Sequence, residues 1–392
     1  MATTEQGTRA SSGARSVSEA VREVEQGRLA TEEMILNVGP QHPATHGVFR
    51  LLATIDGEKL VDAEPIIGYM HRGYEKLVEA RDYRQITNLV SRMDWLSGIN
   101  NELPLWLVVE KMMEIEVPPR AQYLRVIMCE MNRILNHLMF FASFGAELGA
   151  ITPTFYAFRE REEIQAAMEM ATGGRMHFGF FRPGGLREDM PRGFFAQALK
   201  GVREAIARLP DYENLLVGNE IFKQRTIGVG VLPKDVAYSY GVSGPIARGS
   251  DIDFDVRKDE PYLVYDHFDF EVHSAPNGDC FDRFWVLVHE VVESAKIVEQ
   301  AIEGIPSGPV LGKVPRVVQV PQGECYVRTE NSLGELGMYL VSDGDRRPYR
   351  LKIRTPSYSN VSALPYVLKD TFVSDMIAIL GSFFFVLGDI DR

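Results

Sequence analysis

Short apolar runs of strand length follow a polar tail of about thirty residues at the start of the chain. Met34–Val38 and Phe49–Ile55 are two such runs. The residues Ile55–Glu58 include Asp56-Gly57 and supply the turn of a hairpin that returns through Lys59–Pro65. The pattern therefore predicts a small sheet in the amino-terminal part.

The spacing of apolar residues becomes helical from Gly73 to about Leu148, and the same period returns in three later segments. Pro118-Pro119 is a start signal for one helix, and Gly/Pro-rich connectors such as Arg182–Gly185 separate others. The predicted helices are Leu103–Ile115, Arg120–Glu147, Arg161–Thr172, Arg192–Leu209 and Asp282–Glu303. We expect these helices to pack against one another as a bundle.

Strand-like runs return near the carboxyl end at Gly323–Thr329, Leu336–Val341 and Tyr349–Ile353. Ser342–Asp345 forms a tight turn between them, and we expect this hairpin to join the first sheet. The predicted class is α+β, with a large central helical bundle and a small antiparallel β-sheet domain built from N-terminal and C-terminal strands.

Four segments follow from these patterns. Residues 1–30 are expected to be a flexible tail with one short polar helix around Ser16–Gln26. Residues 31–72 form the amino-terminal β part and residues 73–305 the helical core. Residues 306–392 hold the carboxy-terminal β hairpin and a terminal segment.

Composition excludes several classes of protein. The 392 residues include 45% hydrophobic and 24% charged residues, the balance of a globular protein. A net charge of -12 without a basic cluster argues against a nucleic-acid partner. The tail lacks the apolar core of a secretory signal, and the apolar stretches Leu138–Phe144 and Met376–Gly388 are shorter than the roughly 20 residues of a membrane span. The chain is expected to stay inside the cell without crossing a membrane.

Cysteine usage and missing motifs exclude further chemistry. Cys129, Cys280 and Cys325 lie far apart without a C-x-x-C pair, so they cannot assemble a zinc or iron–sulfur site, and each is expected to be a small buried hydrophobe in a reducing cytoplasm. No phosphate-binding glycine loop is present, so the chain has no evident means of binding the phosphates of NADH or ATP. The signatures of α/β-hydrolases, zinc proteases and kinases are also absent.

Two loops carry candidate chemistry. Asn37–Gly47 holds His42 and His46 on a Gly- and Pro-bounded turn between two strands, where a histidine can donate a proton or can simply pin the turn to carbonyls. Ile67–Lys76 and Arg92–Trp95 combine charged, aromatic and glycine residues, which suits either a polar-lined cavity or a solvated helix cap. Spacing alone leaves both pairs of interpretations open.

Many ordered phrases together resemble the family of D-type subunits of complex I, also called the 49 kDa subunit family. The similarity runs from about residue 33 to the end. The phrases are Asn37–Gly47, Ile67–Lys76, Pro118–Ala121, Asn136–Leu138, Gly149–Pro153, Phe158–Glu162, Arg182–Gly185, Val256–Lys258, Gly334–Gly337, Leu340–Gly344 and Gly388–Arg392. The resemblance implies one component of the proton-translocating NADH:quinone oxidoreductase, which is not active alone.

This family is related to the large subunit of nickel–iron hydrogenases and has lost the cysteine ligands of the metal. Arg92–Ser97 and Gly388–Arg392 carry no cysteine here, whereas a nickel–iron site needs four thiolates. The resemblance therefore implies a quinone pocket in place of the metal, with quinone as substrate and no metal or flavin bound by this chain. An active hydrogenase-type enzyme is the rival interpretation, and nickel in the purified protein would support it.

The resemblance also assigns site residues. The headgroup histidine falls on His46, and its acidic partner, normally Asp, falls on Glu147. The second donor, normally a tyrosine in an R-M-D-Y phrase, falls on Trp95, with Met93 beside it in the quinone-binding set. An indole N–H still donates a hydrogen bond but cannot transfer a proton as a phenol can. Trp95 therefore either serves as a donor or plugs a vestigial cavity.

Partners and location follow from the same resemblance. Electrons would arrive from NADH through iron–sulfur clusters, the last on the B-type subunit, and the implied partners are complex I subunits of the B, C, H and I types, with a contact to the membrane arm. The implied place is peripheral, on the cytoplasmic side of the cell membrane.

Pro306–Pro321 is shorter than the corresponding family segment, which indicates a divergent branch. A non-catalytic scaffold paralogue in a partial complex is the alternative function.

Overall fold

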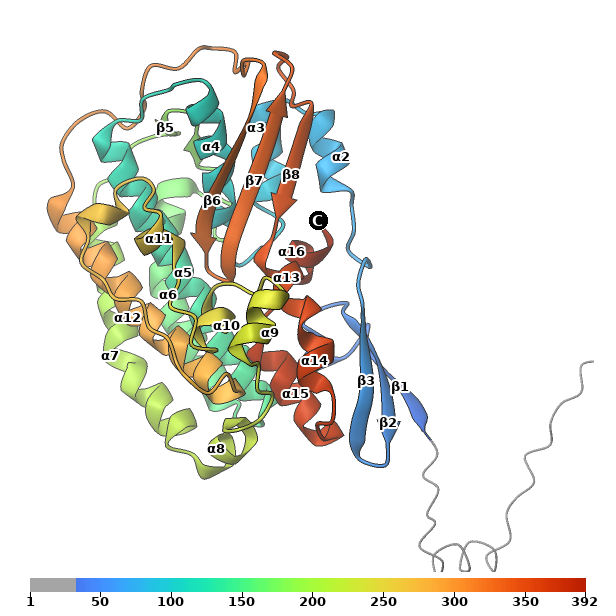
Figure 1. Cartoon of the computed structure of the whole chain (residues 1–392). Coiled ribbons are helices and arrows are strands. Elements are labelled where there is room, and N and C mark those ends of the chain that lie inside the picture. The colour runs from blue at the N-terminus through green and yellow to red at the C-terminus, as the bar shows by residue number, and fades with distance from the viewer. Residues whose placement is uncertain (1–32) are drawn as a thin grey trace, which may run out of the picture.

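The computed structural model describes residues 33–392 as a helical bundle flanked by two small sheets (Figure 1). The expected tail 1–30 and the polar helix around Ser16–Gln26 lie outside the described residues. The α+β class predicted from the sequence is confirmed.

The amino-terminal sheet has the strand order β1-β2-β3 and is antiparallel throughout. Its strands are β1 (Met34–Val38), β2 (Arg50–Asp56) and β3 (Lys59–Ile66), close to the predicted ranges. Side chains of β2 alternate between buried and half-buried positions, as expected for a strand with one face on a core. The free edge of β3 is closed by a later segment, because Leu60 N donates to Thr371 O at 2.8 Å.

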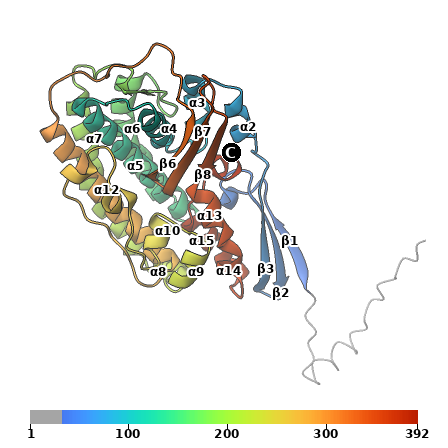
Figure 2. The same ribbon diagram turned by 45° about the horizontal axis from the view of Figure 1, so that its top comes forward.

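Five long helices form the bundle, and α5 runs through its centre (Figure 2). They are α4 (Gly98–Met112), α5 (Pro119–Glu147), α6 (Thr152–Thr172), α7 (Phe194–Tyr212) and α12 (Cys280–Gly304). Helix α5 packs against α4, α6 and α12, and most of its 29 residues are buried. Its length brings the buried middle of the bundle and the cavity described below onto one rigid element.

Helix α6 begins nine residues earlier than predicted, at Thr152 instead of Arg161. Pro153 lies in the first turn, a position that proline favours. The exposed side chains of Phe155 and Phe158 obscure the amphipathic pattern of this first part. The prediction was wrong there because apolar residues face outward.

Short helices connect the long elements and surround the carboxyl end. They are α2 (Tyr74–Glu79), α3 (Tyr83–Val90), α8 (Glu220–Thr226), α9 (Lys234–Ser239), α10 (Pro245–Arg248), α11 (Val256–Asp259), α13 (Pro356–Ser362), α14 (Leu364–Leu368), α15 (Val373–Ser382) and α16 (Leu387–Asp391). A two-residue ladder joins β4 (Phe181–Arg182) and β5 (Gly185–Leu186).

The carboxy-terminal strands form a second sheet, β6-β7-β8, from β6 (Gly323–Asn331), β7 (Gly334–Ser342) and β8 (Arg350–Arg354). The prediction that this hairpin joins the first sheet is wrong, because the two sheets share no strand pairing. Other segments border the outer strands: α2 packs along β8, where Glu75 accepts from Ile353 N at 3.2 Å, and the Thr371 segment closes β3. Both views keep the sheets apart (Figures 1 and 2).

Two of the three cysteine predictions are confirmed. Cys129 on α5 and Cys280 on α12 are buried. Cys325 is only half-buried, because the first half of β6 extends past the core. In residues 33–392 we find no helix that combines the length and the apolar character needed to cross a bilayer.

Candidate functional site

The two histidines of the Asn37–Gly47 loop have different surroundings. A single 3₁₀ turn, Pro43–Thr45, separates them. His42 caps this turn, since its Nδ1 accepts a hydrogen bond from Ala44 N at 3.2 Å. His46 follows the turn in the left-handed conformation with φ 48°, and Thr45 Oγ1 donates to His42 O at 2.7 Å. The pinning interpretation therefore applies to His42, while the His46 side chain is turned to another element.

His46 meets Glu147, the last residue of α5. The distance from His46 Nε2 to Glu147 Oε1 is 2.9 Å, and each side chain is 10% exposed. This is ion-pair distance, but the ring N–H is not aligned on the carboxylate as a hydrogen bond. His46 Nε2 and Glu147 Oε2 find no hydrogen-bond partner in the described part of the chain. Both groups can therefore still bond to a further molecule.

Glycine at position 381 lets this carboxylate approach α15 closely. A Cβ at Gly381 would overlap Glu147 Oε2 and would lie 3.0 Å from Phe144 Cδ2. The imidazole of His46 is held from the other side by Phe385, with ring centroids 5.1 Å apart. Backbone and aromatic contacts thus position the two polar groups.

A cavity of about 410 Å³ opens at this pair. Its lining comes from the histidine loop, the Ile67–Lys76 loop, the loop before α4, α5 and the chain from the end of α15 into the start of α16. The lining residues are Pro43, His46, Gly47, Met70, Trp95, Leu96, Met139, Ser143, Glu147, Phe384, Phe385, Val386, Leu387 and Gly388. A mostly apolar wall with few polar groups is typical of a site for an apolar ligand with a polar head.

Trp95 and Met93, the other two predicted site residues, take different places. Trp95 lines the cavity and is 38% exposed. Met93 is fully buried, and its carbonyl oxygen packs against the Cα of Gly388 so closely that a side chain at 388 would overlap it. Met93 thus supports the cavity wall from behind.

The Ile67–Lys76 loop is tied to the end of the chain. Gly68 N and Met70 N each donate to the Asp391 carboxylate at 2.7 Å, and His71 Nδ1 lies 2.6 Å from Asp391 O. Met70 lines the cavity, whereas Tyr74 begins α2. One part of this loop thus lines the cavity, and another part begins a helix with a buried tyrosine.

Comparison with known proteins identifies the family of this chain. The family model described as "Respiratory-chain NADH dehydrogenase, 49 Kd subunit" matches residues 147–319 and 313–392. The NADH-quinone oxidoreductase D-type subunit numbered 2 in Salinispora tropica is 52% identical over 362 residues, which cover 92% of this chain and 93% of the relative. The NADH-quinone oxidoreductase D-type subunit of Geobacillus kaustophilus is 48% identical, covering 93% and 99%.

The chain belongs to the 49 kDa subunit family. This membership confirms the resemblance seen in the motifs and makes the chain one component of a respiratory-chain oxidoreductase. The NADH-quinone oxidoreductase D-type subunit numbered 1 in Streptomyces coelicolor, 51% identical over 93% of this chain and 97% of its own length, agrees.

Sequence reasoning missed part of this family member's cavity wall. Met139 and Ser143 lie eight and four residues before Glu147 on α5, so helical spacing from Glu147 could have identified them. Met70 and the Phe384–Gly388 segment gave no comparable signal, because they reach the cavity only through long-range packing.

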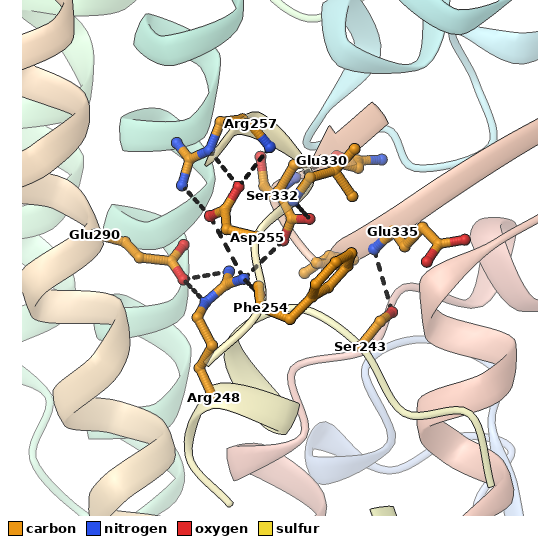
Figure 3. Close-up of polar contacts among 12 residues, drawn as sticks. Ser243, Arg248, Phe254, Asp255, Arg257, Glu290, Glu330, Ser332 and Glu335 are labelled. Atoms are coloured by element: carbon orange, nitrogen blue, oxygen red, sulfur yellow. Dashed lines mark hydrogen bonds and ion pairs between the residues drawn. The ribbon is translucent and has the colours of Figure 1, made fainter. Parts of the chain in front are cut away.

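A fully buried charge network lies deeper in the bundle (Figure 3). Arg248 contacts Glu290 at 2.5 Å and Glu330 at 3.0 Å, and Arg257 contacts Asp255 at 2.6 Å. On α5, Arg133 and His137 extend the network to Glu130 and Glu290. Burial and the charge of Asp255 raise the pKa of Glu330 to about 7. The network joins α5, α10, α11, α12 and β6 by charge.

One group of side chains has the spacing of metal ligands. Donor atoms of Glu271, His273 and Glu293 all lie within 4.8 Å of one another. Lys296 Nζ contacts Glu293 Oε1 at 2.7 Å, so this carboxylate already has a cationic partner. The group has no residue in common with the cavity lining.

Proposed function

We propose that this chain is the D-type subunit of a proton-translocating NADH:quinone oxidoreductase and forms its quinone-reduction site together with the B-type subunit. The observation that supports this most is the apolar cavity at the His46–Glu147 pair, in which an imidazole and a carboxylate retain free bonding capacity. Family membership and relatives named as D-type subunits of NADH-quinone oxidoreductase supply the reaction class.

Quinone reduction takes up two electrons and two protons. In this proposal NADH supplies the electrons through iron–sulfur clusters on other chains, the last on the B-type subunit. His46 Nε2 donates a hydrogen bond to one quinone oxygen and passes a proton to it, while Glu147 compensates the positive charge on the ring. The indole N–H of Trp95 serves the second oxygen as a hydrogen-bond donor.

The assembly and its place are part of the same proposal. The B-, C-, H- and I-type subunits are the expected neighbours, and the chain contacts the membrane arm from the cytoplasmic side as a peripheral protein of the cell membrane. Ubiquinone and menaquinone both have the two carbonyl oxygens and the apolar tail that this cavity would take.

Replacing the imidazole tests this function in the assembled complex. His46→Ala should abolish quinone reduction, because it removes the proton donor, while the complex still assembles and still passes electrons from NADH to an artificial acceptor. His42→Ala is the matched control. It removes a turn cap on the same loop and should retain most quinone reduction. Normal turnover in His46→Ala would exclude His46 from the mechanism.

A further inference from the structure

Two fully buried aspartates lie directly behind the cavity wall. Asp94 precedes Trp95 and Leu96, and Asp389 follows Gly388. These neighbours line the cavity, and the close packing of Gly388 on the Met93 carbonyl brings the two chain segments together. Segments about 295 residues apart thus place two carboxyl groups in one dry region.

Each carboxyl has one oxygen bound and one oxygen without a partner. Asp94 Oδ1 accepts from Leu96 N at 3.0 Å, and Asp389 Oδ2 accepts from Ser357 N at 3.0 Å. Asp94 Oδ2 and Asp389 Oδ1 are buried without a hydrogen-bond partner among residues 33–392. An unpaired buried carboxylate is costly, so protonation is the favourable way to relieve it.

Neither carboxyl forms an ion pair within the described residues. The other charged groups on the surrounding elements have partners of their own. Arg354 donates to Glu335 O, Arg392 donates to Ile353 O, Asp391 accepts from Gly68 N and Met70 N, and His46 pairs with Glu147.

Burial and the charge of Asp389 raise the pKa of Asp94 to about 7, and burial raises that of Asp389 to about 6. Such coupled groups titrate as a pair.

We propose that Asp94 and Asp389 share a single proton and form a proton reserve for the cavity. The sharing rests on the close approach of the two backbone segments at Met93 and Gly388 and on the two buried oxygens without a partner, whereas the use of this proton in quinone reduction rests on the proposed function. In that use the aspartate pair delivers one of the two protons that quinol formation requires, and the His46–Glu147 pair delivers the other. Both aspartates are then charged, and a proton from water restores the reserve.

The chemistry of Trp95 explains why the cavity needs a second proton donor. The indole N–H donates a hydrogen bond but does not release its proton under physiological conditions. One of the two protons must therefore come from elsewhere, and the carboxyl group of the preceding residue, Asp94, is buried at the same wall.

Infrared titration of the full-length chain with isotope-labelled aspartate tests the sharing. The label separates the pair from the glutamates Glu102 and Glu330, whose pKa values burial also raises to about 7. The wild type should lose one protonated aspartate signal between about pH 5 and pH 8. In Asp94→Asn the midpoint of Asp389 should fall by about one unit or more, and Asp389→Asn should do the same to Asp94, because the repulsion is reciprocal.

Unchanged midpoints in both single variants would show two independent carboxyls and overturn the sharing. In the assembled complex, Asp94→Asn should move the alkaline limb of quinone reduction to lower pH by about one unit. The control Asp211→Asn, on α7 and not part of the cavity lining, should leave the profile unchanged. An unchanged profile in Asp94→Asn would overturn the reserve. Failure of the His46→Ala test would overturn the proposed function but leave the infrared result intact.

Discussion

Trp95 is the residue at which a single side chain changes the chemistry of the cavity. Trp95→Tyr replaces an indole with a smaller ring whose hydroxyl both donates and accepts hydrogen bonds. One hydrogen bond is worth about 1 kcal/mol, so the KM for quinone should change by roughly 5-fold. The rate should also depend less on Asp94, because a phenol can transfer a proton.

Steady-state kinetics of the assembled complex check this change. Trp285→Tyr is the matched control, since Trp285 stacks on Phe281 of α12, does not line the cavity and should leave the KM unchanged. If Trp95→Tyr has unaltered kinetics and the wild type shows no inhibitor-sensitive quinone reduction, the indole plugs the cavity. The scaffold function would then replace the catalytic one.

The sequence predicted which residues lie together for one pair of site residues but not for another. His46 and Glu147 were named as a pair from motif resemblance, and they lie 2.9 Å apart. Asp94 and Asp389 were each inside named phrases, yet no local pattern indicates that residues so distant in sequence share a buried space. Burial and long-range proximity arise from tertiary packing, which periodicity does not contain.

At the scale of elements, the crossing of α15 over the end of α5 sets the position of Glu147. Gly381→Ala adds a methyl group where Glu147 Oε2 lies, so the carboxylate must move away from His46. Quinone reduction should fall at least tenfold, an effect of misplacing a proton-transfer group by about 1 Å. Alanine favours a helix over glycine by roughly 1 kcal/mol, which offsets part of the strain.

Activity and thermal unfolding together check the Gly381→Ala effect. Gly304→Ala is the control, because its added methyl would meet nothing closer than 3.5 Å and should leave activity unaltered. Full activity in Gly381→Ala would mean that quinone reduction does not depend on the position of the Glu147 carboxylate.

The sequence predicted the type and position of most helices and strands, but it did not predict which of them pair or pack together. The periods of two and about four residues located the predicted strands and long helices of the described chain, except that α4 begins at Gly98 instead of Leu103 and α6 at Thr152 instead of Arg161. They could not show that the Thr371 segment closes β3 and that α2 packs along β8, so the two sheets were wrongly joined. Strand edges are filled by whichever segment reaches them in the folded chain.

At the scale of the whole molecule, one charge network ties the bundle to the second sheet (Figure 3). Three arginines, Arg133, Arg248 and Arg257, face four carboxyls, Glu130, Asp255, Glu290 and Glu330. All seven side chains are buried, so neutrality requires one further proton. Glu330 is the carboxyl whose pKa rises, and that of Glu290 falls because of Arg248 and His137 despite burial.

These opposite shifts predict opposite effects of pH on stability. The folded pKa of Glu330, about 7, exceeds its ordinary value of 4.5, so the folded state binds more protons and loses stability as pH rises through this range. In Glu330→Gln the side chain at position 330 is uncharged at every pH. The free energy of unfolding of this variant, relative to that of the wild type, should therefore increase by a few kcal/mol from about pH 5 to about pH 8.

Glu290→Gln should behave in the reverse sense. The folded pKa of Glu290 is depressed, so its stabilisation is present above its ordinary pKa of 4.5 and is lost as pH falls. Removing that charge leaves Arg248 with one partner fewer and should destabilise the chain most at neutral pH. Urea unfolding of both variants and the wild type at about pH 3, 5 and 8 measures the two effects, because the stabilisation by Glu290 is lost only below its ordinary pKa of 4.5, whereas that by protonated Glu330 is lost only above it. If Glu330→Gln did not gain stability relative to the wild type between about pH 5 and about pH 8, Glu330 would not be the protonated member of the network.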